Sequence, residues 1–228
     1  MINSIDARFK NNYEQAFKHV LPWRMPVIVR LDGKCFHNFT SKMAKPFSYA
    51  FTYDMNLVAK YLIEEVDTAR LAYVQSDEIS LLLIPYNKLA SQPWFGNEIQ
   101  KICSVTAGIA SSYMTLRNNR IAVFDSRCFV IPETEVVNYF ISRQQDCTRN
   151  SINAFGQSVF SHSELQHKSQ SEILDMLYDK GYEWESLVTR FKRGSAAYRD
   201  NTDITIDTEI PIFSKDREYI SRFLATEE

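Results

Sequence analysis

The order of hydrophobic periodicities in the first 131 residues restricts the fold of this chain more than any other feature of the sequence. Short apolar runs predict strands, and apolar residues spaced by three or four predict amphipathic helices. The resulting order is strand, helix, strand, strand, helix, strand, which is the split βαβ pattern of the ferredoxin-like fold. The strands are expected at 27–31, 71–75, 79–84 and 121–131, the last with a break at 125–126, and the helices at 51–66 and 99–116.

Helical patterns flank this core on both sides. Apolar residues at spacings of three or four from Ile2 to Val20 predict a helix that ends at Pro22 and packs on the domain that follows. From Pro132 onward the pattern is mainly helical, and Gly181 closes the last predicted helix. Helices of this extension are expected at 136–140, 152–160 and 173–178.

The composition is that of a globular protein with enough apolar residues for a full core. The chain has 228 residues, of which 45% are hydrophobic and 13% aromatic. No flexible linker separates its two halves. We therefore expect one compact α+β unit, with a palm-like catalytic core at residues 1–131 and a mainly helical extension at 132–228.

Cysteine usage and the amino terminus indicate a cytoplasmic protein. The four cysteines form no CxxC pair, so neither a disulfide framework nor a zinc site is expected, and they are predicted to be buried thiols in a reducing compartment. They are Cys35, Cys103, Cys128 and Cys147. No apolar run at the amino terminus approaches the roughly 20 residues that cross a bilayer, so no membrane segment is expected.

Charge is balanced over the whole chain, with 26 Lys and Arg against 28 Asp and Glu, a formal net charge of −2. A uniformly basic nucleic-acid binder is therefore excluded, and any phosphate contacts must come from local patches. Each patch can also be an ordinary solvated surface. The candidate patches are Arg117 with Arg120, Arg143 with Arg149, and the run from Arg190 to Arg193.

Two carboxylates are the strongest candidates for chemistry. In the predicted topology the first and second strands lie on either side of the third, so the end of the first strand and the tip of the hairpin share one sheet edge. This places Asp32 near Asp77, an arrangement that suits Mg²⁺ held by few protein oxygens and by substrate phosphates. Each residue can instead belong to a simple turn. Glu78 is a further ligand or a neighbouring carboxylate, and Gly33 can offer its carbonyl oxygen.

Other sites are poorly supported by the sequence. The four histidines have no metal-binding spacing, and no Walker A, GxSxG or GxGxxG run is present. His37 follows the loop after Asp32 and can touch phosphate, although a lone histidine is more often structural.

Six short motifs occur in order along the chain, and together they resemble the histidine-tRNA guanylyltransferase superfamily. The motifs are Arg30-Leu31-Asp32-Gly33 with Phe36-His37, Lys45-Pro46, Gln75-Ser76-Asp77-Glu78, Ala110-Ser111-Ser112-Tyr113, Phe124-Asp125-Ser126-Arg127 and Arg143-Gln144-Gln145-Asp146. The resemblance extends from about Arg8 to about Gly194, and the ordered set is far more specific than any one motif.

The resemblance implies a catalytic core similar to the palm of polymerases and of some nucleotide cyclases. It implies that Asp32, the Gly33 carbonyl and Asp77 bind two Mg²⁺ ions, and that Glu78 is also needed for activity. Residues implied to lie near the nucleoside triphosphate or the tRNA 5′ end are Arg30, Lys34, His37, Lys45, Ser76, Lys101 and Arg127.

The resemblance also implies a reaction and an assembly. Members activate a tRNA 5′-monophosphate with ATP, releasing pyrophosphate, and the 3′-hydroxyl of an incoming GTP or other NTP then attacks the activated phosphate. They are typically tetramers, so a homotetramer is expected, in which tRNA meets basic patches from several subunits.

One departure from the family pattern indicates a branch. Eukaryotic members carry His-Ile-Asn-Asn after the Asp-Cys pair, whereas this chain has Thr148-Arg149-Asn150-Ser151, which resembles bacterial, archaeal and phage-type members. Those members repair 5′-truncated tRNAs by template-dependent 3′-to-5′ addition, and this is the expected function. Residues expected to contact tRNA are Arg143, Arg149, Asn150, Ser151, Arg190, Lys192 and Arg193.

Three alternatives stay open at the level of the sequence. The nearest is an enzyme that adds a single guanylate to histidine tRNA, and the others are a palm-type nucleotide cyclase and an RNA-binding protein with a decayed site.

A second departure, Phe47-Ser48 where relatives often carry a polar residue and an acid, puts one contact to the activating nucleotide in doubt.

Overall fold

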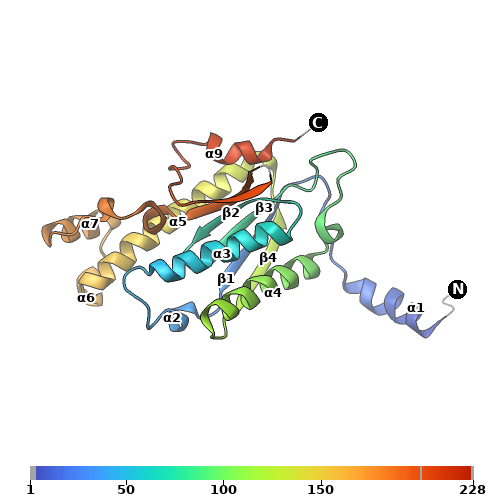
Figure 1. The fold of residues 1–228 in the computed structure, drawn as a ribbon, viewed down its shortest axis with the longest axis horizontal. Helices are drawn as coiled ribbons and strands as arrows, with labels where there is room; N and C mark the ends of the chain where they lie inside the picture. The colour runs from blue at the N-terminus through green and yellow to red at the C-terminus, as the bar shows by residue number, and fades with distance from the viewer. Residues whose placement is uncertain (1–3, 201, 227–228) are drawn as a thin grey trace.

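The structure is a computed structural model that describes residues 4–200 and 202–226. Its centre is a six-stranded sheet in the order β4-β1-β3-β2-β5-β6, and all neighbouring strands are antiparallel (Figure 1). The strands are β1 (Val27–Gly33), β2 (Ala69–Gln75), β3 (Glu78–Leu83), β4 (Phe124–Val130), β5 (Ser195–Asp200) and β6 (Asp203–Asp207).

The first four strands confirm the predicted ferredoxin-like core. β1 and β2 both pair antiparallel with β3, so they run in the same direction on either side of it. The predicted break in the last strand is wrong, because Asp125 and Ser126 pair with Asp32 and Leu31 and β4 continues through them.

Helices cover both faces of the sheet (Figure 1). α3 and α4 pack on one face, against the side chains of Val27, Val29 and Leu31, whereas the intervening Ile28 packs on the α5 side. This separation follows from the alternation of side chains along a strand. The helices are α1 (Ile5–Phe9), α2 (Phe36–Phe39), α3 (Tyr49–Glu65), α4 (Ile99–Asn118), α5 (Glu133–Val159), α6 (His162–Leu165), α7 (Gln170–Asp179), α8 (Thr189–Arg193) and α9 (Glu218–Ser221).

The carboxyl-terminal extension differs from the predicted pattern in two respects. α5 is one helix of 27 residues where two separate runs were expected. The extension also contributes β5 and β6 to the sheet, although no strand was expected between 195 and 207. β5 is short and begins with serine and alanine, which have little preference for strands, and its pairing with β2 is what makes it a strand.

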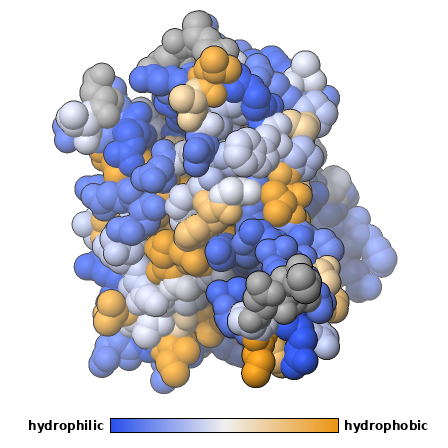
Figure 2. Space-filling model, turned by 90° about the vertical axis from the view of Figure 1, so that its right-hand side faces the viewer, coloured by the Kyte–Doolittle hydropathy of each residue, from blue (hydrophilic) through white to orange (hydrophobic). Residues whose placement is uncertain are grey.

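The amino-terminal helix does not pack on the domain as expected. Ile2 lies outside the described residues, and from α1 the chain continues through irregular helical turns to Phe17 without a buried residue. Ile5, Phe9 and Phe17 are 72%, 50% and 68% exposed. Figure 1 shows this segment projecting from the body, and Figure 2, which views the molecule from that side, shows scattered apolar side chains at the surface.

The cysteines are less buried than expected. Among the four, only Cys147 is buried, whereas Cys35 is exposed. Cys103 and Cys128 are half-buried, and their Sγ atoms lie 3.6 Å apart. Within the described residues, no helix is both long and apolar enough to cross a membrane.

Candidate active site

A row of carboxylates crosses one end of the sheet. Asp125 on β4, Asp32 on β1 and Glu78 on β3 are direct cross-strand partners, so their side chains leave the same face. Asp77 lies in the turn before β3, and its carbonyl accepts a hydrogen bond from the Gly33 amide over 3.1 Å. The fold therefore brings Asp32 and Asp77 to one edge, as the topology predicts.

The charges of Asp32 and Asp77 are only partly offset by the protein. Burial raises the pKa of the Asp32 carboxyl, and the nearby carboxylates of Asp125 and Glu78 raise it further. Burial is also the main cause of the raised pKa of Asp77, to which Asp32 adds. Arg127 is paired with Asp125, and the Arg30 Nε atom lies 4.0 Å from Glu78. The site thus has excess negative charge.

This donor set fits Mg²⁺. Two carboxylates and one backbone carbonyl, that of Gly33, would leave most coordination positions to phosphate oxygens and water, as is usual for this ion. Among the described residues, no group of three or more His, Cys, Asp or Glu side chains forms a metal cage.

Gly33 is required at the end of β1 by a close approach. A Cβ atom built on it would lie 2.4 Å from a ring carbon of Phe36, which is buried. Gly33→Ala should destabilise the protein by about 1–3 kcal/mol, because an overpacked core must shift its side chains or backbone. Thermal unfolding measures this effect, and Gly108→Ala, where a Cβ meets no atom within 4 Å, is the control. An unchanged Gly33→Ala melting temperature would contradict the packing.

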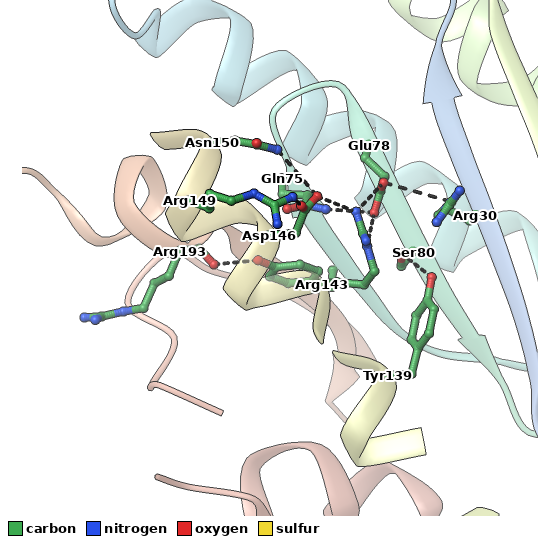
Figure 3. A network of polar contacts seen from close by, with 11 residues as sticks. Arg30, Gln75, Glu78, Ser80, Tyr139, Arg143, Asp146, Arg149, Asn150 and Arg193 are labelled. Carbon is green, nitrogen blue, oxygen red and sulfur yellow. Dashed lines mark hydrogen bonds and ion pairs between the residues drawn. The ribbon is translucent and has the colours of Figure 1, made fainter. Parts of the chain in front are cut away.

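Glu78 lies in a different environment from its neighbour Asp77. Its two carboxylate oxygens accept hydrogen bonds from the Arg143 Nε and Nη2 atoms at 2.8 and 2.9 Å, and Gln75 donates another at 2.8 Å. Arg143 also donates to Asp146 on α5 (Figure 3). The sequence contained both motifs, but nothing in it indicated this contact across 65 residues.

The other residues expected near the nucleotide lie at different distances from the carboxylates. Arg30 and Arg127 are adjacent in the sheet, and Ser76 is in the turn before Asp77 with a φ of 49°. Lys34, His37 and Lys45 are exposed on the segment that follows β1. Lys101 is not brought to this site. It pairs with Glu98 at the start of α4, about 15 Å along the helix from Ser111, which contacts β4 next to Gly33.

A cavity of about 500 Å³ lies beside the carboxylates. It is lined by Asp32, Asp77 and Glu78, and also by apolar side chains from three elements that the sequence did not bring together. These side chains are Met43, Phe47, Phe51 and Phe191. The volume is typical of small-molecule sites, and a nucleotide has both an anionic and an apolar part.

Comparison with known proteins identifies the family. Residues 7–132, just over half of the chain, match the sequence profile of the family described as Thg1: tRNAHis guanylyltransferase. The chain belongs to this family. The resemblance seen in its motifs is thereby confirmed.

Two solved structures described as bacterial tRNA(His) guanylyltransferase (Thg1)-like protein are closely similar to this chain. One, solved in complex with ATP, is 42% identical with a TM-score of 0.93, covering 96% of this chain and 99% of that one. The other, in complex with GTP, is 39% identical with a TM-score of 0.88, covering 97% and 99%. The tRNA(His) guanylyltransferase of Saccharomyces cerevisiae shares the fold, with 22% identity and a TM-score of 0.76 over 91% and 99%. Identity is thus higher to the bacterial members, as the run from 148 to 151 predicted.

Curated relatives are more distant and mostly longer. An uncharacterized protein of Acanthamoeba polyphaga mimivirus is 27% identical over 65% of this chain, and this chain spans 61% of its length. The tRNA(His) guanylyltransferase of Debaryomyces hansenii is 26% identical over 76% of this chain and 73% of its own.

The residues that the sequence suggested as tRNA contacts lie on α5 and α8, but their side chains differ in exposure to solvent. Arg149 is exposed, whereas Ser151 is buried and accepts a hydrogen bond from the Trp184 Nε1 atom over 3.0 Å. Lys192 is also buried, and its ammonium donates to the Glu185 carbonyl. A second cavity of about 620 Å³ is lined by Arg143, Arg149, Lys192 and Arg193, while Asn150 and Arg190 line the first.

Proposed function

We propose that this Thg1-family chain is a Mg²⁺-dependent nucleotidyltransferase that repairs 5′-truncated tRNAs by template-dependent addition in the 3′-to-5′ direction. One observation carries the proposal: Asp32 and Asp77 line the same cavity as the aromatic side chains of Phe47, Phe51 and Phe191. A cavity with these two properties suits a nucleoside triphosphate, with its phosphates at the carboxylates and its base against the rings. The two bacterial Thg1-like structures, one in complex with ATP and one with GTP, support this.

Two displacements at phosphorus make up the proposed reaction. The tRNA 5′-phosphate attacks the α-phosphate of ATP and pyrophosphate leaves, and the 3′-hydroxyl of the incoming NTP then attacks the activated 5′-phosphate and AMP leaves. Bound Mg²⁺ would neutralise charge on the entering and leaving oxygens. Asp32 and Asp77 would hold the ions, while Arg30 and Arg127, adjacent on β1 and β4, would bind phosphate oxygens.

The direct test incubates the purified protein with Mg²⁺, ATP, labelled NTPs and a 5′-monophosphorylated tRNA that lacks its first nucleotide. Extension by one nucleotide with pyrophosphate release is expected. A parallel reaction without tRNA tests the cyclase alternative, because a cyclase converts NTP alone. Absence of extension with all four NTPs would refute the proposal.

A second candidate is addition of a single guanylate to histidine tRNA. The family description and the names of relatives such as that of Debaryomyces hansenii favour it. The two functions share their chemistry and differ only in the RNA substrate. Full-length histidine tRNA, offered beside truncated tRNAs in the same assay, separates them.

Binding of tRNA should be salt-dependent and should depend on Arg149, the exposed cation of α5. Arg149→Gln is expected to lower the slope of log affinity against log salt by about 0.7–0.9, the effect of one lost phosphate contact. Lys192→Gln should leave the slope unchanged and reduce stability instead, because its ammonium is directed inward. Filter binding across salt concentrations measures the slope. An unchanged slope for Arg149→Gln would make this patch merely solvated surface.

We also propose a cytoplasmic homotetramer. The exposed apolar side chains of the amino-terminal helical segment support association, because Phe9 and Phe17 are 50% and 68% exposed and no residue from Ile5 to Phe17 is buried. The double substitution Phe9→Asp with Phe17→Asp should shift the mass measured by light scattering to a smaller species. Asn11→Asp with Asn12→Asp, on the same segment, is the charge-matched control. A tetramer that survives the double substitution would show that this helix is not the contact.

A further inference from the structure

The carboxylate of Glu78 has both oxygens occupied by protein donors. The Arg143 guanidinium binds it in a bidentate manner, Gln75 donates to Oε1, and the side chains of Glu78 and Arg143 are only 12% and 16% exposed. Paired, well-oriented donors of this kind fix a carboxylate strongly. Among the described residues no ion pair is found for its neighbour Asp77, whose pKa is raised by burial and by the nearby carboxylate of Asp32.

Arg143 is equally constrained on its other side. Its Nη2 atom also donates to the Asp146 Oδ2 atom over 2.8 Å, and Asp146 accepts further hydrogen bonds from Arg149 and Asn150 (Figure 3). Arg149 and Asn150 of α5 are thus connected through Asp146 and Arg143 to Glu78. Gln75, the second donor to Glu78, lies at the end of β2, and only the two turn residues stand between it and Glu78.

We propose that Glu78 is a positioning residue that acts through Arg143, rather than a ligand of the metal ions. The ion pair joins the β2–β3 hairpin, which carries Asp77, to α5, which carries Asp146 and Asn150. These last two residues line the same cavity as Asp32 and Asp77. The pair therefore fixes the wall of the nucleotide cavity relative to the metal carboxylates. The inference rests on the proposed nucleotide addition.

The geometry also assigns a protein-internal role to Arg143, which the sequence suggested as a tRNA contact. Its guanidinium is mostly buried and engages two carboxylates of the chain itself. Arg149, nearly two helical turns further along α5 and 55% exposed, is the better placed of the two for a phosphate.

A double-mutant cycle with Glu78→Gln and Arg143→Gln tests the inference. Each single substitution should slow nucleotide addition about tenfold, and the double variant should be no more than about threefold slower than either, because residues that act as one unit are not additive. Arg143→Lys keeps the charge but not the bidentate geometry and should recover part of the loss. Lys168→Gln with Glu172→Gln, an exposed ion pair at 3.3 Å, is the matched control and should have no effect.

Binding of Mn²⁺, a probe of the metal site followed by electron paramagnetic resonance in the presence of ATP, distinguishes a positioning residue from a ligand. Affinity should change less than about threefold in Glu78→Gln and in Arg143→Gln, whereas Asp77→Asn should lose binding. Loss of Mn²⁺ affinity in Glu78→Gln to the level of Asp77→Asn would overturn the inference, as would multiplicative rate effects in the double variant. Because Mn²⁺ binding needs no tRNA, a wild-type protein that binds Mn²⁺ but extends no tRNA would refute the proposed function alone.

Discussion

Asp32→Ala and Asp77→Ala are each expected to lower the rate of nucleotide addition by at least about a thousandfold. A bound metal ion stabilises charge at phosphorus by several kcal/mol, and about 4 kcal/mol corresponds to a factor of a thousand in rate. Both carboxylates lie at the sheet edge beside the cavity, so each substitution removes a donor without opening the core. Extension of a truncated tRNA under single-turnover conditions measures the loss.

Protein stability provides the control for this prediction. Burial and neighbouring carboxylates raise the pKa of both groups, so their ionised forms are disfavoured in the folded protein. At neutral pH and without metal, Asp32→Asn and Asp77→Asn should therefore unfold at the same temperature as the wild type or at a higher one. Asp175→Asn, an exposed position on α7, is the matched change and should retain full activity. Near-normal rates in either Asp→Ala variant would refute the metal assignment.

The second large effect concerns the choice of nucleotide. Thr148-Arg149-Asn150-Ser151 stands where eukaryotic members carry a histidine-containing run, so this enzyme should rely on the opposing acceptor-strand base to select the NTP. One base-pair step contributes on the order of 1.4 kcal/mol, so each non-complementary NTP should be disfavoured at least about tenfold. The protein itself would then bind helix shape, phosphates and 2′-hydroxyls.

Four truncated tRNAs that differ only in the opposing base, each tested with all four NTPs, measure this preference. Complementary addition in every case supports repair. Guanylate addition opposite every base would place the chain in the other branch of the family. The position of the run on α5 adds a structural control: Ser151 is buried against Trp184, so Ser151→Ala should affect stability more than nucleotide choice.

The sequence by itself determined the core and the central carboxylates of the candidate site. Strand and helix periodicities are local properties, and few topologies connect four strands and two helices in the observed order. The order of these elements was therefore enough to place Asp32 beside Asp77. The sequence did not predict strands in short segments that lack a clear local preference. β5, with its serine and alanines, is a strand because it pairs with β2.

Only the tertiary structure decided how the site is built around those carboxylates. The cavity wall combines residues from the loop before α3, from α5 and from α8, and the Glu78–Arg143 pair joins residues 65 positions apart. The same packing leaves Arg149 exposed and buries Lys192, although the sequence suggested both as tRNA contacts. Such contacts depend on which side chains meet when helices pack on the sheet. These contacts cannot be predicted from a local sequence pattern. Hydrophobic periodicity specifies which face of an element is buried, but not which other residues that face packs against.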